Sequence, residues 1–465
     1  KSVRRPWIPI LVYNPHPFKI RKIIDCEFQL ADQNWSDTWT DIKVYSGRKA
    51  LGTQVENEAS NMNLDWRKRV IFEAELAPSC MNRFDCKLIS LKTRPLPKLL
   101  PGKTHIEFKS GHMSVKINKR TGLMDSYCVD RKQIIKAKAF CPVVMHDNAD
   151  PWTISSDRYN KVIGKFRKAS QQQTAQWCGS DKSRLDAVRV IEDGEVRTVI
   201  ESILKYNNSM IVIQYMLPKQ GTEFSVNLRV FWAEKDRVLK LAIPMTGMKH
   251  QFVGQTAFGV QDFDTAGQEM VSQKWQAVKE HTENWMFSCI DDGIYGSDFK
   301  NGQLRLTLLK SSAYSAYPIS DRPMTPQDRF VPRIDQGERC YTFHFNAGDL
   351  NERLNDIDRE SLVHNEHPIA LSFFPNFDVS KPIAKQGVTL SGKSIDITAI
   401  KFAEDSNDII IRLFNPTAQT QKTNVNVKWM DLKFSVTLGA YEVKTYRIDS
   451  KNIKVHQTDM LEKIL

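Results

Sequence analysis

Apolar runs and short turn signals alternate at regular spacing between residues 184 and 245. The turns are rich in Gly, Asn and Asp, and the runs are rich in Val, Ile, Leu and aromatic residues, which is typical of consecutive antiparallel strands. In the fourth run every second residue is apolar, as expected of a strand with one buried face: Phe224, Val226, Leu228, Val230 and Trp232. The five runs predict a β-meander and a mostly β fold: RLDAVRVI, EVRTVIESILKY, MIVIQYML, TEFSVNLRVFWAE and RVLKLAIPM.

Helical periodicity is almost absent from the rest of the chain. The two best candidates are short segments, residues 349–362 and the C-terminal tail TDMLEKIL at 458–465. We expect short helices there and strands elsewhere.

Domain boundaries follow from composition. A chain of 465 residues exceeds one simple core, and the Pro-rich stretch KTRPLPKLLPGK is typical of a linker. The prediction is three domains: a small β-sandwich at 1–95, a large β-domain at 96–348, and a connector with a small C-terminal β-sandwich at 349–465.

The net charge of +12 raises the possibility of a nucleic-acid partner. However, 54 acidic residues are interleaved with 66 basic ones, without a block of five like charges or a nucleic-acid fold motif. Solvated strand faces explain this pattern better, so we expect no nucleic-acid partner. No apolar run approaches the ~18 residues of a membrane span, so we expect no membrane association either.

The eight cysteines form no CxxC pair and no zinc-ribbon spacing. Most lie in apolar β-rich contexts, which favours free thiols over a disulfide framework. Free thiols indicate a reducing compartment, and we expect a cytoplasmic protein.

The stretch SCIDDGIYGSDFKNGQLRLTLL, from residue 288 onward, contains three aspartates and could be a metal loop or a hairpin. It lacks the spacing and terminal Glu of an EF-hand loop. Asn301-Gly302 followed by alternating leucines is a hairpin signal. We predict turn and loop residues here and no metal ligands.

Two further clusters have both a functional and a plain interpretation. His146, Asp147, Asp150 and Trp152 would suit contact with a sugar, but an Asx-rich loop explains them better. The HNEH segment at 364–367 would hold a metal only on a helix, and Pro368 favours a loop. No nucleophile elbow, phosphate loop or defensible acid–nucleophile pair is present, so we predict no catalytic residue and no metal site in this chain.

Several segments together resemble the C-terminal half of family-38 glycoside hydrolases, the α-mannosidases, in their cytosolic and bacterial branch. The resemblance covers nearly the whole chain in order, and rests on these segments: ILVYNPHPF, LRVFWAEKDRVLKLAIPM, FGVQDFDTAGQEMVSQKW, CIDDGIYGSDFKNGQLRLTLLKSSAYSAYP, IDQGERCYTFHF and GAYEVKTYRI. It implies a small β-sandwich, a large supersandwich of the galactose-mutarotase type, and a terminal β-sandwich.

The resemblance also implies where the chemistry lies. In that family an N-terminal α/β barrel, followed by a helical bundle, carries a zinc ion, an Asp nucleophile and a second carboxylate for a retaining mechanism, with carboxyls roughly 5 Å apart. None of those motifs occurs here, and the chain begins at Lys1 without a Met. We therefore expect a piece of a longer polypeptide, inactive alone, that completes the fold and walls the substrate cleft.

The resemblance places a few polar residues of the β-domains near an α-mannoside or oligosaccharide substrate. The candidates here are Asp150, Trp152, Lys274, Trp275, Asp292 and Tyr295. The expected partners are the chain's own catalytic barrel and helical bundle, and a homo-oligomer is plausible for this branch.

Three alternatives remain open. One is a hydrolase of 2-O-mannosylglycerate or its phosphorylated form, which relatives in the family act on. The others are a stand-alone carbohydrate-binding β-protein and, from charge alone, a nucleic-acid-binding protein.

Overall fold

The computed structural model describes residues 7–58, 64–147, 157–313, 322–323, 325–372 and 386–465. The fold is mostly β, as the sequence predicts. The chain divides into two compact units. One unit contains Lys1–Leu96, Gly194–Val196 and Asp358–Leu465, and the other contains Pro97–Asp193 and Arg197–Ile357. The three-domain boundaries expected from composition stay a prediction.

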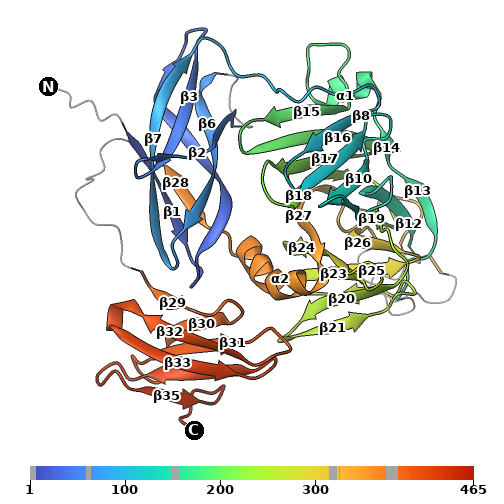
Figure 1. Cartoon of the computed structure of the whole chain (residues 1–465). Helices are drawn as coiled ribbons and strands as arrows, with labels where there is room; N and C mark the ends of the chain where they lie inside the picture. Colours follow the sequence, from blue (N-terminus) through green and yellow to red (C-terminus); the bar gives the residue numbers. More distant parts are fainter. Residues whose placement is uncertain (1–6, 59–63, 148–156, 314–321, 324, 373–385) are drawn as a thin grey trace. The chain divides into compact units, whose positions relative to one another are not determined.

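The first unit begins with a two-sheet sandwich, drawn mainly in blue in Figure 1. Its apolar core lies between the sheets and includes Val12, Val44 and Phe72, all fully buried. One strand comes from far along the chain, since β28 pairs antiparallel with β1. The larger sheet has the order β28 (Ile369–Ser372), β1 (Ile8–Asn14), β7 (Cys80–Leu91), β3 (Trp39–Ser46), β4 (Lys49–Ala50). The smaller sheet has the order β2 (Ile20–Asn34), β6 (Asp65–Leu76), β5 (Thr53–Asn57).

The C-terminal part of this unit is a second small sandwich, drawn in red in Figure 1. Ile411, Leu413 and Val425 lie in its core. The predicted C-terminal helix is wrong: β35 (Val455–Thr458) joins the sheet, and turns and a bridge from Thr458 to Ile464 follow it. One sheet has the order β29 (Val388–Leu390), β32 (Gln421–Val427), β33 (Leu432–Leu438), and the other β30 (Asp396–Phe402), β31 (Ile409–Phe414), β34 (Val443–Ile448), β35.

The second unit is the large supersandwich. A ten-stranded sheet shares one apolar core with a four-stranded and a six-stranded sheet. Aromatic rings fill its centre, with the ring centroids of Phe140 and Phe345 4.9 Å apart and those of Tyr127 and Phe224 4.8 Å apart. Such edge-to-face pairs add specific geometry to the burial of large apolar surfaces.

The ten-stranded sheet has the order β14 (Arg167–Lys168), β16 (Arg197–Tyr206), β17 (Ser209–Pro218), β18 (Phe224–Trp232), β27 (Gly337–Asp349), β24 (Trp285–Asp291), β23 (Trp275–Glu280), β20 (His250–Thr256), β21 (Gly259–Phe263), with β15 (Val188–Asp193) also on β16. The four-stranded sheet has the order β11 (Lys132–Gln133), β10 (Met124–Val129), β9 (Met113–Asn118), β8 (His105–Lys109). The six-stranded sheet has the order β13 (Val162–Lys165), β12 (Cys141–His146), β19 (Arg237–Pro244), β26 (Gln303–Lys310), β25 (Gly296–Lys300), β22 (Met270–Val271).

Four of the five predicted meander strands pair in sequence order, from β15 to β18. The alternation in β18 is confirmed, because its five alternate apolar side chains are at most 2% exposed. The fifth strand is a correction: β19 leaves the meander and pairs with β12 and β26 in the other sheet. Its sequence VLKLAI is buried on both faces, which suits an interior strand better than a one-sided meander strand.

The predicted helix at 349–362 is confirmed as α2 (Leu350–Asn365). Leu350, Leu354 and Ile357 pack on the outer face of the ten-stranded sheet, against Trp275 and Ile290. A second, short helix, α1 (Gln171–Trp177), begins at a capping box formed by Ser170 and Gln173.

The hairpin predicted at Asn301-Gly302 is confirmed. Both residues have positive φ, 52° and 70°, and they join the antiparallel strands β25 and β26. Positive φ at both central positions is the geometry that Asn-Gly favours, and its twist matches that of the flanking strands.

A buried ion cluster crosses the outer face of the six-stranded sheet. Lys240 on β19 is fully buried and contacts the carboxylates of Asp298 on β25 and of Glu269. Asp298 is also fully buried and accepts a hydrogen bond at 2.6 Å from Nε of Arg305 on β26. The Lys240 ammonium lies 5.2 Å from the ring centroid of Tyr159. These ion pairs thus link strands of the sheet through charged side chains that are shielded from water.

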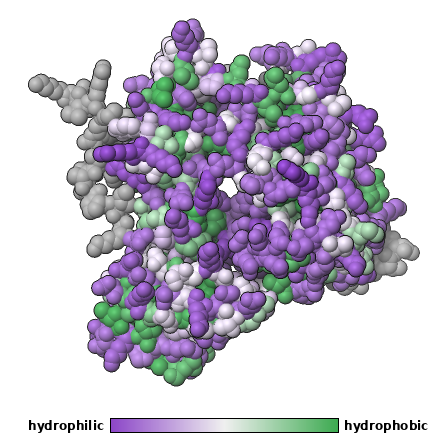
Figure 2. Space-filling model, in the orientation of Figure 1, coloured by the Kyte–Doolittle hydropathy of each residue, from purple (hydrophilic) through white to green (hydrophobic). Residues whose placement is uncertain are grey.

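The surface is predominantly polar. In Figure 2 the visible face is mostly hydrophilic, with hydrophobic residues scattered in small groups. All eight cysteines are free thiols, as predicted, although Cys178 and Cys340 are exposed. Among the described residues, no helix is both long and apolar enough to span a membrane.

We expect Lys240→Met to lower the free energy of unfolding by about 3 kcal/mol, because the substitution leaves buried carboxylates without their cation. The matched control is Lys116→Met in the same unit. Lys116 pairs with Glu107 at 3.4 Å, and both side chains are about 45% exposed, so its loss should cost less than about 1 kcal/mol. Urea denaturation of both variants tests this, and equal losses would contradict a structural role for the cluster.

Candidate functional site

Four of the predicted site residues lie at one end of the β23–β24 hairpin. Trp275 pairs with Ile290, so the chain before β23 lies beside the chain after β24. The Asp291 N–H donates to the Lys274 carbonyl at 3.1 Å. Nearby, the Ser272 N–H donates to the carbonyl of Tyr295 at 3.0 Å. Lys274 and Trp275, at the start of β23, therefore lie close to Asp292 and Tyr295, which follow β24. We call this region the hairpin edge.

Their exposures differ sharply. Asp292 is exposed, Tyr295 is 55% exposed, and Lys274 is partly buried. Trp275 is fully buried beneath α2, where its indole packs in the core and presents no face to a sugar. Contact of Lys274, Asp292 and Tyr295 with a substrate stays a prediction.

Asp291 is a feature of this edge that the sequence did not reveal. The sequence predicted a loop residue, but Asp291 ends β24 and is only 1% exposed. Burial raises the pKa of its carboxyl to about 8, although hydrogen bonds from the Ile294 backbone and the Gln276 side chain oppose the rise. At neutral pH the carboxyl is therefore mostly protonated. The sequence feature that could have indicated this burial is the position of Asp291 directly after the apolar run WMFSCI.

The other sequence candidates are separate from this edge. Asp150 and Trp152 lie outside the described residues. Asp147 is buried, burial raises the pKa of its carboxyl, and Lys310 Nζ lies 3.4 Å from its Oδ1. The loop prediction for the HNEH segment is wrong for His364, which lies within α2, but it holds for Glu366 and His367, which follow the helix after Asn365.

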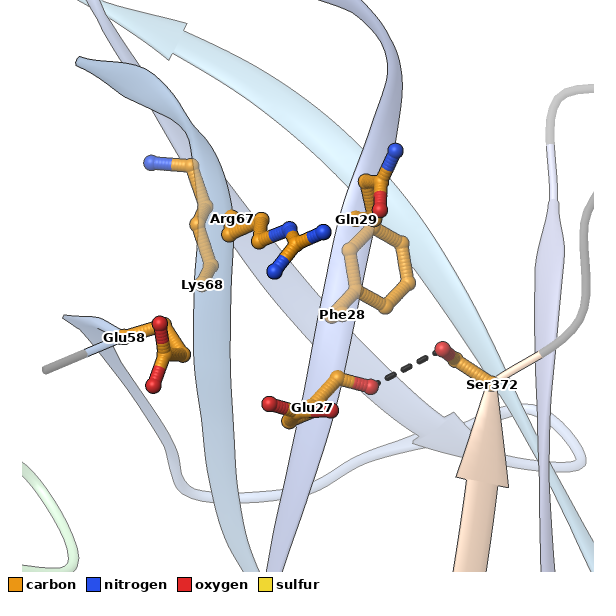
Figure 3. Close-up of a pocket in the computed structure, with 7 residues that line it drawn as sticks. All are labelled: Glu27, Phe28, Gln29, Glu58, Arg67, Lys68 and Ser372. Carbon is orange, nitrogen blue, oxygen red and sulfur yellow. Dashed lines mark hydrogen bonds between the residues drawn. The ribbon is translucent and has the colours of Figure 1, made fainter. Parts of the chain in front are cut away.

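A small cavity of about 240 Å³ lies in the first sandwich, between β2, β6 and β28. Figure 3 shows the Ser372 hydroxyl donating to the carbonyl of Glu27, at 2.9 Å, across one side of it. The Lys68 ammonium points away from Glu27 and Phe28, and it lies 3.3 Å from the ring centroid of Trp39. The cavity is smaller than the ~300 Å³ at which ligand pockets usually begin, so we assign it no ligand.

The zinc of family-38 enzymes needs several His and Asp ligands that converge on one point. Within the described residues of either unit taken by itself, no three His, Cys, Asp or Glu side chains bring ligand atoms that close.

Two family models match the chain. The model for the glycosyl hydrolases family 38 C-terminal domain matches residues 108–321, which make up most of the large supersandwich. The model for the glycosyl hydrolases family 38 C-terminal beta sandwich domain matches residues 394–434, in the last sandwich. Together they span more than half of the chain, which belongs to the glycosyl hydrolase family 38 as a C-terminal β region.

Two solved structures share this fold, both from Enterococcus faecalis. One is a protein in glycosyl hydrolase family 38, with a TM-score of 0.69 and 13% identity over 96% of this chain and 59% of that one. The other is an α-mannosidase, with a TM-score of 0.67 and 13% identity over 96% of this chain and 56% of that one. The chain thus spans less than two thirds of either. A comparison with curated proteins gives no match.

We expect Asp291→Asn to change how stability depends on pH. The folded-state pKa of about 8 lies above the usual 3.8, so the protonated carboxyl stabilises the fold at low pH, and this contribution is lost as pH rises through about 8. The free energy of unfolding of the wild type should therefore fall relative to that of Asp291→Asn between about pH 4 and pH 8, by at least about 1 kcal/mol.

Urea unfolding at several pH values measures this difference. Asp292→Asn is the control, because it makes the same Asp-to-Asn replacement at the exposed neighbouring residue. A constant difference between wild type and Asp291→Asn across the pH range would contradict the assignment.

Proposed function

We propose that this chain is the non-catalytic C-terminal β region of an α-mannosidase-type glycoside hydrolase that cleaves α-mannosides with retention. The observation that carries the proposal is the family match over residues 108–321, on a unit whose sheets form the expected supersandwich. The likeness to the two bacterial structures supports the fold.

In this proposal the nucleophile, the acid/base and the zinc ligands belong to a separate catalytic segment, the barrel and helical bundle of the same enzyme. Two buried carboxylates of the large unit are unsuited to attack a sugar. Asp291 is enclosed, and Asp298 is bound to Lys240 and Arg305.

The β region would then complete the fold of the enzyme and wall one side of the substrate cleft. The end of the β23–β24 hairpin is our candidate for the part of the wall that contacts the sugar. Tyr295 offers a ring that can stack on C–H faces, while Lys274 and Asp292 can hydrogen-bond to hydroxyls. We propose a cytoplasmic enzyme and an oligosaccharide or simpler α-mannoside substrate, with self-association as a further possibility to test.

We expect the purified chain to hydrolyse no aryl α-mannoside, because in this proposal the paired carboxylates and the metal that the mechanism needs belong to the catalytic segment. Chromogenic assays with added Zn²⁺ measure this, with a full-length family-38 enzyme as positive control. Turnover in proportion to the concentration of the chain would overturn the proposal. Saturable binding of a mannoside without turnover would instead favour the stand-alone carbohydrate-binding alternative.

If the hairpin edge contacts substrate, Tyr295→Ala in the full-length enzyme should raise KM about 10-fold, through loss of a stacking contact. Phe258→Ala is the matched control, because Phe258 is a comparably exposed aromatic residue of the same unit, at 49% against 55%. Equal KM values for Tyr295→Ala and the wild type would contradict the proposal that this edge contacts the substrate.

A further inference from the structure

A second, larger cavity lies in the supersandwich unit beside β12 and β13. Its volume is about 860 Å³, within the ~300–1,000 Å³ typical of small-molecule sites. Six basic side chains line this cavity, which we call the basic groove: Arg120, Lys138, Lys165, Arg167, Lys168 and Arg305. No aspartate or glutamate is among its described lining residues.

The charges of the basic groove are largely uncompensated. Five of the six side chains are exposed, and none of these five forms an ion pair with another described residue. Elsewhere in this unit basic side chains usually have acidic partners, as in the pairs Arg189–Glu201 and Lys219–Asp193. Like charges around one concave surface repel one another, and a bound anion would relieve that repulsion.

The sixth basic residue is held rigidly. Arg305 is 5% exposed, and its Nε donates to the buried Asp298 carboxylate at 2.6 Å. Its Nη2 has no hydrogen-bond partner among the described residues. A buried guanidinium with a spare donor is costly to the free protein, and the ion cluster keeps it in place without flexible side-chain motion.

The remaining lining residues are not charged. Val143, Phe166 and Ala242 contribute apolar surface, and Thr121 and Gln303 can hydrogen-bond to a neutral polar group. The groove therefore combines strong anion attraction with a surface suited to a carbon skeleton. That combination fits a small organic phosphate better than a bare inorganic ion.

We propose that the basic groove binds a small organic phosphate, with the phosphoryl group among the Arg and Lys side chains. A phosphoryl group carries about two negative charges and several acceptor oxygens, which match forked guanidinium donors. The site is independent of the hairpin edge and of the proposed hydrolase role.

The test is isothermal titration of the whole chain with glucose 6-phosphate and with glucose. Only the phosphate ester should bind, and its affinity should fall as salt rises from 50 to 300 mM because counterions screen the groove. The double variant Arg167→Glu, Lys168→Glu should weaken binding at least 10-fold. Both residues are exposed on β14, so the fold should tolerate the change.

The control is the double variant Lys109→Glu, Lys182→Glu, which makes the same net charge change at exposed lysines of this unit outside the groove. Its affinity should stay within twofold of the wild type. Ligand protection of Lys138 and Lys165 from acetylation, without protection of Lys109, would locate the site.

Several outcomes would overturn the proposal: no binding of glucose 6-phosphate at millimolar concentration, equal binding of glucose, or equal loss in both double variants. Strong binding of a single-stranded RNA oligonucleotide without binding of the sugar phosphate would also overturn it and revive the nucleic-acid alternative.

Discussion

The large unit depends on one long-range strand pairing. β27 lies between β18 and β24, pairing with β18 over residues 337–345 and with β24 over residues 343–349. It joins the meander before it to the hairpins that follow β19, so that the ten strands form a single sheet. Without this strand, each half would present an unpaired edge and an open apolar face. The shared core around Phe140, Phe224 and Phe345 contains residues from both halves.

Burial on both sides of the sheets has chemical consequences. α2 covers the outer face of the ten-stranded sheet, and this cover turns Trp275 into a core residue. On the outer face of the six-stranded sheet, burial is combined with charge, so Lys240, Asp298 and Arg305 must satisfy one another. The same ion cluster positions Arg305 at the basic groove. Arg305 therefore has a structural role in the ion cluster and a proposed binding role in the basic groove.

The family assignment and the site geometry together suggest a division of labour. In the proposed function, the chain supplies a large β scaffold and the chemistry lies on another segment. Exposed polar residues at the β23–β24 edge and uncompensated cations in the basic groove are distinct kinds of surface. The β23–β24 edge suits neutral hydroxyls and the basic groove suits anions. The proposed sugar contact and the proposed phosphate site can therefore fail independently.

Local patterns in the sequence determined the elements that depend on neighbouring residues. The alternation in 224–232, the Asn301-Gly302 hairpin and the helix near 350–362 were all predictable, because strand period, turn geometry and helical period are local properties. The sequence could not assign β19 to another sheet or pair β27 with β18, since such contacts join residues far apart in the chain, as in the pair Phe224 and Phe345. Only the tertiary structure decided that Asp291 is buried, that Trp275 lies under α2, and that six scattered cations share one cavity. Burial and charge clustering arise from long-range packing, which no short stretch of sequence encodes.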